Sequence, residues 1–145
     1  MPSYVTNDSR FEVPDGFVDR TVTRLEAKTE NGATILIMLH KSRFVEGQHL
    51  DDAVASHLKD ASANLRAHSV LANREARLAG HPAYDIAMRW REDDGMVYMR
   101  EMHADVDGTW FIVSSTGPLE ERETCDSCFD YMIPTIELNP HDREE

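Results

Sequence analysis

Three β-type runs joined by two short turns restrict the fold of this chain more than any other feature. The runs cover residues 83–90, 96–104 and 109–116. Asp94-Gly95 and Asp107-Gly108 separate them, and an Asp-Gly pair between β-type runs is a strong signal for a hairpin. The stretch therefore predicts an antiparallel meander of three strands.

The turns also predict the register of the meander. A two-residue turn in the second hairpin places Met102 opposite Val113, and the first hairpin places Met88 opposite Met99. Side chains alternate across a sheet, so this register sorts the meander into two faces. The more apolar face carries Tyr84, Ile86, Met88, Trp90, Val97, Met99, Trp110 and Ile112.

Length and composition indicate one soluble domain with a sizeable core. The chain has 145 residues, of which 41% are hydrophobic and 29% are charged, as in ordinary globular proteins. We expect a single domain over residues 1–138 and a polar tail over residues 139–145. The formal net charge is -12, which argues against binding to nucleic-acid phosphates or anionic membranes.

The sequence favours a cytoplasmic protein. It contains no run of about 18 apolar residues, so we expect no membrane-spanning segment. The N-terminus lacks the basic start and the apolar run of a secretory signal. Cys125 and Cys128 are the only cysteines, too few for a disulfide framework, which suits a reducing compartment.

Further strands are expected on both sides of a helix. Residues 10–13, 21–25 and 33–40 have strand character, with a hairpin turn at Asn31-Gly32. The run 33–40 is apolar on both faces, which is typical of a central, covered strand. We expect another strand at residues 69–77, and Gly117-Pro118 is expected to end the sheet after the meander.

Two helices complete the predicted α+β domain, in which an antiparallel sheet carries two main helices. The first spans residues 50–65, where apolar side chains recur at three- and four-residue spacing. The second spans residues 120–133 and ends before Pro134. Its inward side chains are predicted to be Cys125, Phe129 and Met132.

No motif specifies catalysis or a cofactor. Cys125-Asp126-Ser127-Cys128 has the spacing of a redox pair, but it lies within the predicted helix instead of at a helix N-terminus. We therefore interpret both cysteines as structural. The seven histidines form no His-x-x-x-His pair, and no nucleophile elbow or phosphate-binding glycine loop is present. We predict no enzymatic activity, no cofactor and no metal ligands.

Two polar residues on apolar faces are the unusual feature. Glu101 lies on the more apolar face of the meander, opposite Ile86 and Ser114, and His57 lies at the inner edge of the first helix. One interpretation is an internal ion pair or two solvated rim residues. The other is an apolar binding groove that carries a few polar side chains.

The chain resembles the DcrB-like proteins, which have the PsbP-like α/β fold. The similarity covers residues 4–138 and rests on the order and spacing of four short motifs. They are residues 11–17 (an apolar pair followed by Pro14 and Phe17), residues 80–83 before a strand ending at Trp90, residues 99–101, and residues 132–134. Within this superfamily the length and the acidic balance are most similar to the Eag chaperones of type VI secretion.

That resemblance implies a function and a site. Eag chaperones are cytoplasmic homodimers that shield the apolar N-terminal transmembrane segments of PAAR-containing effectors until loading on the secretion spike. The residues matching their client-binding groove are Val22, Arg24, Met38, His57, Ala61, Leu65, Val97, Met99 and Glu101. His57 and Glu101 match side chains that hydrogen-bond the client, although the family usually has amides there and an aliphatic residue in place of Arg24.

Three functions therefore remain open from the sequence. The first is the client chaperone, with no nucleic acid and no membrane insertion. The second is a small enzyme or metal-binding domain that uses His57, Glu101 and His103. The third is a non-catalytic interaction module of the same fold without a membrane-segment client.

Overall fold

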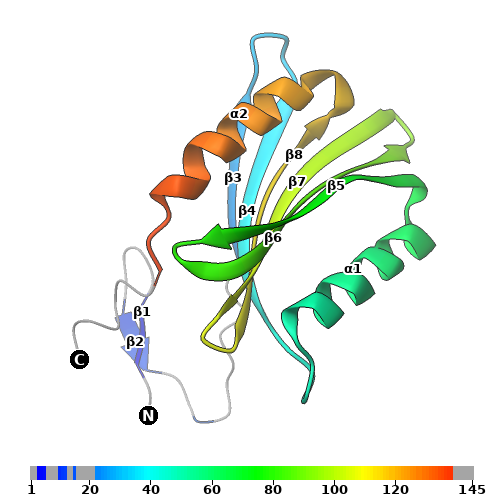
Figure 1. Ribbon diagram of the computed structural model, residues 1–145. Helices are drawn as coiled ribbons and strands as arrows, with labels where there is room; N and C mark the ends of the chain where they lie inside the picture. Colours follow the sequence, from blue (N-terminus) through cyan, green and yellow to red (C-terminus); the bar gives the residue numbers. More distant parts are fainter. Residues whose placement is uncertain (1–2, 6–9, 13–14, 16–21, 139–145) are drawn as a thin grey trace.

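The computed structural model describes residues 3–5, 10–12, 15 and 22–138. Its main sheet has six antiparallel strands in the order β3-β4-β8-β7-β6-β5 (Figure 1). These are β3 (Val22–Lys28), β4 (Thr34–Arg43), β5 (Arg66–Leu78), β6 (His81–Glu92), β7 (Gly95–Val106) and β8 (Thr109–Pro118). The helices are α1 (Leu50–Asn64) after β4, and η1 (Leu119–Glu121), α2 (Arg122–Met132) and η2 (Ile133–Thr135) after β8. Strands β1 (Ser3–Val5) and β2 (Arg10–Glu12) form a separate two-stranded sheet.

The predicted meander is confirmed as β6, β7 and β8, with the predicted register. Met88 lies opposite Met99, and Met102 lies opposite Val113. The first turn is centred on Asp93-Asp94, between the paired residues Glu92 and Gly95. The second turn is at Asp107-Gly108, and both residues have positive φ angles (52° and 89°). Such angles suit the tight, twisted turns that connect antiparallel strands. The α+β fold class is therefore confirmed.

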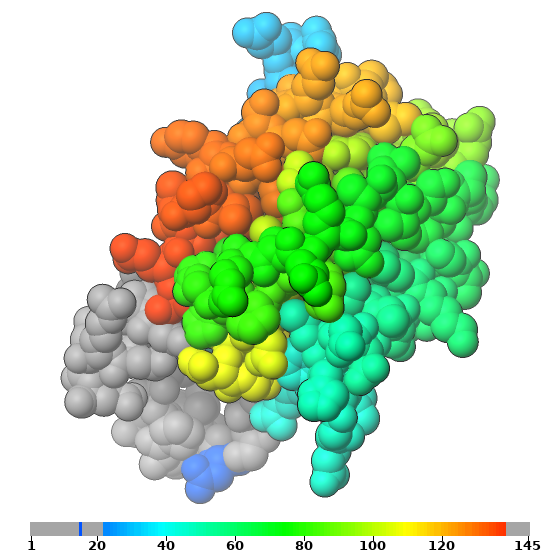
Figure 2. Space-filling model, in the orientation of Figure 1, coloured from blue at the N-terminus to red at the C-terminus, as the bar shows by residue number. Residues whose placement is uncertain are grey.

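The two helices pack on opposite faces of the sheet. Leu50 and Val54 of α1 form one buried cluster with Ile86, Met88 and Trp90. Phe129 of α2 belongs to a second cluster, whose other buried members are Leu78, Ala83, Met102, Ala104, Val106 and Val113. In the space-filling view, side chains of β5 and β6 stand between those of α1 and α2 (Figure 2). We call the two sides of the sheet the α1 face and the α2 face.

Local chemistry explains how α1 begins and ends. Asp52 accepts a hydrogen bond from the His49 backbone N–H at 3.3 Å, which satisfies one of the free donors at the helix N-terminus. The helix ends at Asn64, one residue earlier than predicted, because the backbone of Leu65 is extended (ψ 135°). None of the described helices is long and apolar enough to cross a membrane.

Gly117-Pro118 does not end the sheet as predicted, because both residues still pair with β7, Gly117 opposite Tyr98 and Pro118 opposite Val97. A Cβ atom at position 117 would lie 2.6 Å from Ile35 Cδ1 and 3.0 Å from Cys125 Sγ. Glycine is therefore used here for the close approach of β8 to β4 and α2. The proline closes the strand at its last position, where a missing N–H is tolerated.

Strand β4 is only partly as predicted. It is central, since it pairs with β3 on one side and β8 on the other. However, only Ile35 is buried, and the other residues of the strand are half-buried or exposed.

The sequence prediction of a strand from residue 21 to residue 25 was too short, because β3 continues to Lys28. Residues 13, 21 and 139–145, named in the sequence predictions, lie outside the described residues.

Candidate functional site

Six of the nine residues expected to line a groove lie on the α1 face of the sheet. They are Val22 and Arg24 on β3, Met38 on β4, and Val97, Met99 and Glu101 on β7. The register sets Arg24 opposite Met38, Met38 opposite Ser114, and Ser114 opposite Glu101. Directly paired residues point to the same side of a sheet. One row of side chains thus crosses the face from its edge to Glu101.

Helix α1 and its C-cap supply the other three residues. His57, Ala61 and Leu65 recur every four residues, so they share one side of the helix. Leu65 packs against the buried cluster under α1, and Ala61 is half-buried. His57 Nε2 lies 3.1 Å from Glu101 Oε1. The structure therefore brings together the two polar residues that the sequence singled out, 44 positions apart.

A continuous chain of hydrogen bonds runs from β8 to α1 through this pair. Trp110 Nε1 donates to His103 Nδ1 at 3.0 Å. His103 Nε2 lies 3.2 Å from the same Glu101 oxygen that His57 contacts. The ring of Trp110 also stacks on Phe44, with centroids 5.8 Å apart. Sequence reasoning placed Trp110 on this face but gave no signal for its role in the network.

The donors and acceptors in this network can be assigned. The indole N–H of Trp110 can only donate, so His103 Nδ1 must accept, and the proton of a neutral His103 is then on Nε2. That proton points to Glu101 Oε1, which also accepts from His57 Nε2. No described residue donates a hydrogen bond to Oε2, the second oxygen of Glu101.

Glu101 is a buried carboxylate that remains ionised. Its side chain is only 6% exposed. Burial raises the pKa of such a group, but hydrogen bonds from His103 and His57 outweigh burial and lower the pKa to about 2. The hydrogen bond to Glu101 raises the pKa of His57 above its usual 6.5, against the opposing effect of burial. The pair therefore favours a protonated His57 beside a charged Glu101.

His40 is a fourth histidine near this cluster that sequence reasoning did not single out. It lies on the α1 face of β4, opposite Ile112. Burial lowers the pKa of His40, although the nearby Glu101 opposes this effect. Its Nδ1 is enclosed and has no hydrogen-bond partner among the described residues. A neutral imidazole is the form that fits such a position.

The His57, Glu101 and His103 side chains are close enough to be considered as metal ligands. Their ligand atoms all lie within 4.8 Å of one another. Metal binding needs a free lone pair on each imidazole nitrogen. In His103 the Trp110 hydrogen bond directs the proton to the nitrogen that would bind the metal. The Nε2 atom of His57 also carries a proton in its hydrogen bond to Glu101. The cluster therefore does not offer the three protein ligands of a catalytic zinc site as arranged.

No described helix covers the α1 face on the side of β3. All seven residues of β3 are exposed, including Val22 at 53%. Among the described residues, the ion-pair partner of Arg24 is its exposed neighbour Glu26, at 2.9 Å on the same face. Leu36, Met38 and His40 on β4 are half-buried. We call these β3 and β4 residues of the α1 face the open strip.

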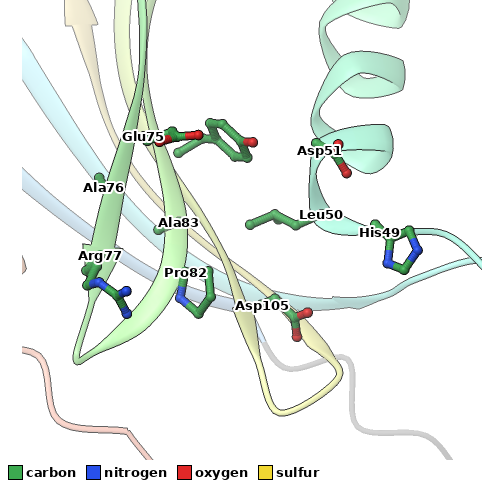
Figure 3. A pocket seen from close by; sticks show the side chains of 10 residues that line it. His49, Leu50, Asp51, Glu75, Ala76, Arg77, Pro82, Ala83 and Asp105 are labelled. Carbon is green, nitrogen blue, oxygen red and sulfur yellow. The ribbon is translucent and has the colours of Figure 1, made fainter.

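Two pockets lie at the ends of α1. One, of about 630 Å³, is at the N-terminal end, where Leu50 lies near β6 and the charged side chains of Asp51, Arg77 and Asp105 border the opening (Figure 3). It contains none of the nine predicted residues. The other, of about 610 Å³, lies beside Leu65 and Trp90 at the C-terminal end of the helix.

The α2 face carries a separate ion-pair cluster centred on Arg100. Its guanidinium binds both oxygens of Asp85, at 3.1 and 2.9 Å, and reaches Asp126 at 2.9 Å and Asp130 at 3.3 Å. It also lies 4.5 Å from the centre of the Phe129 ring. These contacts attach α2 to the sheet and explain why Arg100 is buried.

The cysteines lie on α2, as predicted, and Cys125 faces the core. It is fully buried, and burial raises the pKa of its thiol to about 11. Cys128 is half-buried, and the two thiols are not joined in a disulfide. A thiol with a raised pKa is a poor nucleophile and a poor metal ligand.

The profile of the DcrB family matches residues 8–133. The chain belongs to the DcrB family. No curated protein matches the chain.

Solved structures share the fold of this DcrB-family chain at low sequence identity. The Pseudomonas aeruginosa protein PA94, described as a regulator candidate of unknown function, is 16% identical, with a TM-score of 0.85 over 97% of this chain and 98% of that chain. LpqN of Mycobacterium tuberculosis, involved in cell envelope biogenesis, is 10% identical, with a TM-score of 0.53 over 83% and 85% of the two chains. The PsbP protein of Synechocystis is 13% identical, with a TM-score of 0.52 over 89% and 86%. The PsbP-like fold is thus confirmed.

Proposed function

We propose that this DcrB-family protein is a chaperone of the Eag type. It binds apolar N-terminal transmembrane segments of a PAAR-containing type VI secretion effector in the cytoplasm and shields them until the effector is loaded on the spike. It has no catalytic activity. The observation that carries the proposal is the open strip beside α1, with the buried Glu101 and His57 at its inner border.

The dimensions of the α1 face suit one additional helix. Neighbouring strands lie about 4.8 Å apart, so the distance from β3 to β7 is roughly 14 Å. Helix α1 contacts β5 and β7 at the far side of that interval. An α-helix with its side chains is about 10–12 Å wide. A client helix could therefore lie along β4 with α1 as one wall.

Apolar burial would supply most of the affinity for such a client. Covering roughly 1,000 Å² of apolar surface is worth about 25 kcal/mol before other contributions. Much of this is cancelled by the freedom lost on association. Val22 and Met38 of the open strip and the half-buried Val97 and Met99 on β7 supply apolar surface for this contact.

Selection among apolar clients would depend on polar contacts. A buried donor or acceptor left unpaired costs about 1 to 3 kcal/mol, so a polar group at the border of an apolar surface discriminates between helices. Glu101 and His57 occupy that border. Ala61, small and half-buried on α1, would allow a helix with small residues to approach closely.

A homodimer is part of the proposal. Strands β3 and β5 form the two edges of the main sheet. The exposed side chains on them include Val22 and Leu25 on β3, at 53% and 56%, and Val70 and Leu71 on β5, at 42% and 44%. Exposed edges with apolar side chains favour association with a second chain. Two copies would also enclose a client more completely than one.

The test is co-purification of an effector's N-terminal segment, fused to a soluble carrier and expressed together with the protein. Met99→Asp places a charge beside the proposed client, and Ala61→Trp fills the space that the client helix would occupy. Each variant should abolish retention of the segment. His57→Ala and Glu101→Ala should weaken retention by about 1 to 3 kcal/mol.

Matched controls separate a lost client contact from a damaged fold. Met96→Asp changes the same residue type on the same strand but on the α2 face, where Met96 lies opposite Arg91. Ala63→Trp makes the same enlargement at an exposed position of α1. Both controls should retain the segment. If folded Met99→Asp and Ala61→Trp proteins retain it equally well, as judged with circular dichroism, the client does not lie on this face.

A further inference from the structure

Helix α1 is joined to the sheet by few polar contacts. Among the described residues, its side chains reach the strands through two hydrogen bonds, each involving a histidine. His57 contacts Glu101 on β7 at 3.1 Å, and Ser62 contacts His68 on β5 at 2.8 Å. The remaining attachment is apolar, through Leu50 and Val54 and the residues packed around them.

The His57 contact differs from the Ser62 contact because it compensates a buried charge. Glu101 is an ionised carboxylate with a 6% exposed side chain. Its two hydrogen-bond partners are His57 and His103. The Nδ1 atom of His103 accepts a hydrogen bond from Trp110, and an imidazole nitrogen that accepts a hydrogen bond carries no proton of its own. His57 is therefore the side chain that supplies the positive charge opposite Glu101.

We propose that the His57–Glu101 contact is a pH-responsive latch that fastens α1 to the sheet while His57 is protonated and loosens when His57 becomes neutral. A neutral His57 still donates a hydrogen bond through Nε2. It then leaves the carboxylate without a counter-charge in a largely apolar site, where an uncompensated charge is unfavourable. Loss of the counter-charge weakens the attachment of α1, because His57 is the one described α1 side chain that contacts the Glu101 carboxylate.

The neighbours of His57 on each packed element support this direction. From β7, Glu101 and His103 face it, with the His103 ring centre 4.7 Å away. From β4, His40 is the nearby titratable side chain, and burial lowers its pKa. On α1, Asp60 adds a weaker negative charge that also favours protonation. From β8, the ring of Trp110 lies nearly perpendicular to that of His57, with the ring centres 6.3 Å apart, and carries no charge.

The sign of the pH dependence follows from the raised pKa of His57. The stabilisation is fully present below about pH 6.5, the pKa of histidine in the unfolded chain. It is lost as the pH rises through the higher pKa of His57 in the folded protein. The latch is therefore closed at acidic pH and opens as the pH rises through the raised pKa of His57. The latch itself does not depend on the proposed function, and only its effect on client retention rests on that proposal.

Amide hydrogen exchange of the protein without a client tests the latch. Protection factors, corrected for the intrinsic pH dependence of exchange, are measured for α1 and for the β6–β7 hairpin between pH 6 and pH 9. Protection of α1 should fall about threefold to fivefold over this range, a modest value because His57 is one-third exposed. The hairpin should change little and provides the internal reference.

Two variants decide whether His57 is responsible. His57→Gln keeps a donor near Glu101 but does not titrate, and Glu101→Gln removes the buried charge. In both proteins the protection of α1 should be independent of pH, whereas His68→Gln should still show the decrease. An equal decrease in His57→Gln, or no decrease in the unmodified protein, would overturn the latch. Client retention measured separately at pH 6 and pH 9 tests the proposed function and leaves the exchange result unaffected.

Discussion

Replacement of Arg100 by methionine should be among the most destabilising single changes on the α2 face. Methionine preserves much of the length of the side chain but removes the charge and every donor. Arg100 has a side chain that is only 8% exposed, and its partner Asp85 is only 16% exposed. The variant leaves the Asp85 carboxylate with far less compensation, since its other partner is the exposed Arg74 at 3.5 Å.

The stability lost in Arg100→Met can be estimated from the exposure of each partner of Arg100. Removing one member of a buried ion pair typically costs about 3 to 5 kcal/mol. Asp126 and Asp130 are 36% and 67% exposed, so water can solvate them when Arg100 is absent. We therefore expect about 3 kcal/mol for Arg100→Met. Asp130→Asn, which removes only the exposed 3.3 Å contact, should cost less than about 1 kcal/mol.

Urea unfolding followed by circular dichroism measures these differences in the free energy of unfolding. A double variant, Arg100→Met with Asp85→Val, replaces both buried charges and should be more stable than Arg100→Met alone. This order separates an uncompensated charge from simple loss of packing against Phe129. The reasoning is refuted if Arg100→Met costs less than Asp130→Asn, or if adding Asp85→Val destabilises the protein further.

Two other predictions concern the cysteines and the assembly. Changing Cys125 and Cys128 to alanine should cost about 1 to 3 kcal/mol, mostly from the fully buried Cys125, and should leave client retention intact; loss of retention by a folded double variant would assign the thiols a function. Light scattering at micromolar concentration should give the mass of a dimer, twice 16.5 kDa, and a monomer mass would contradict the homodimer.

The meander and the two helices could be predicted because their signals are local. Asp107-Gly108 defines a turn, the turn defines the register, and the register then assigns every side chain of β7 and β8 to a face. The same logic placed Glu101 on the α1 face opposite Ile86 and Ser114, as the structure confirms. Helical spacing likewise placed Cys125 and Phe129 toward the core, where both are buried.

The errors arose where tertiary contacts override local preference. Gly117-Pro118 is normally a strand-breaking pair, yet both residues still pair within β8, which ends at Pro118. The close approach of Ile35 and Cys125 explains why position 117 needs a residue without a side chain. Trp110 and His103 lie on one predicted hairpin, but the residue types alone do not show that their ring nitrogens are hydrogen-bonded. The enclosed position of His40 Nδ1 depends on which strands flank β4. Sequence spacing does not indicate that β4 pairs with β8, because the paired residues lie from 66 (Arg43 and Thr109) to 80 (Leu36 and Thr116) positions apart.

The charged residues on the two faces of the sheet differ in how readily they lose a proton. On the α2 face, Arg100 holds its charge at any physiological pH, and the acids around it form a fixed attachment for α2. On the α1 face, the only described counter-charge for Glu101 belongs to a histidine, a side chain that loses its proton in the physiological range. Helix α2 is therefore permanently fastened, whereas α1 is fastened conditionally. Of the two helices, α1 is the one that borders the open strip, so the conditional attachment lies where a bound partner would require adjustment.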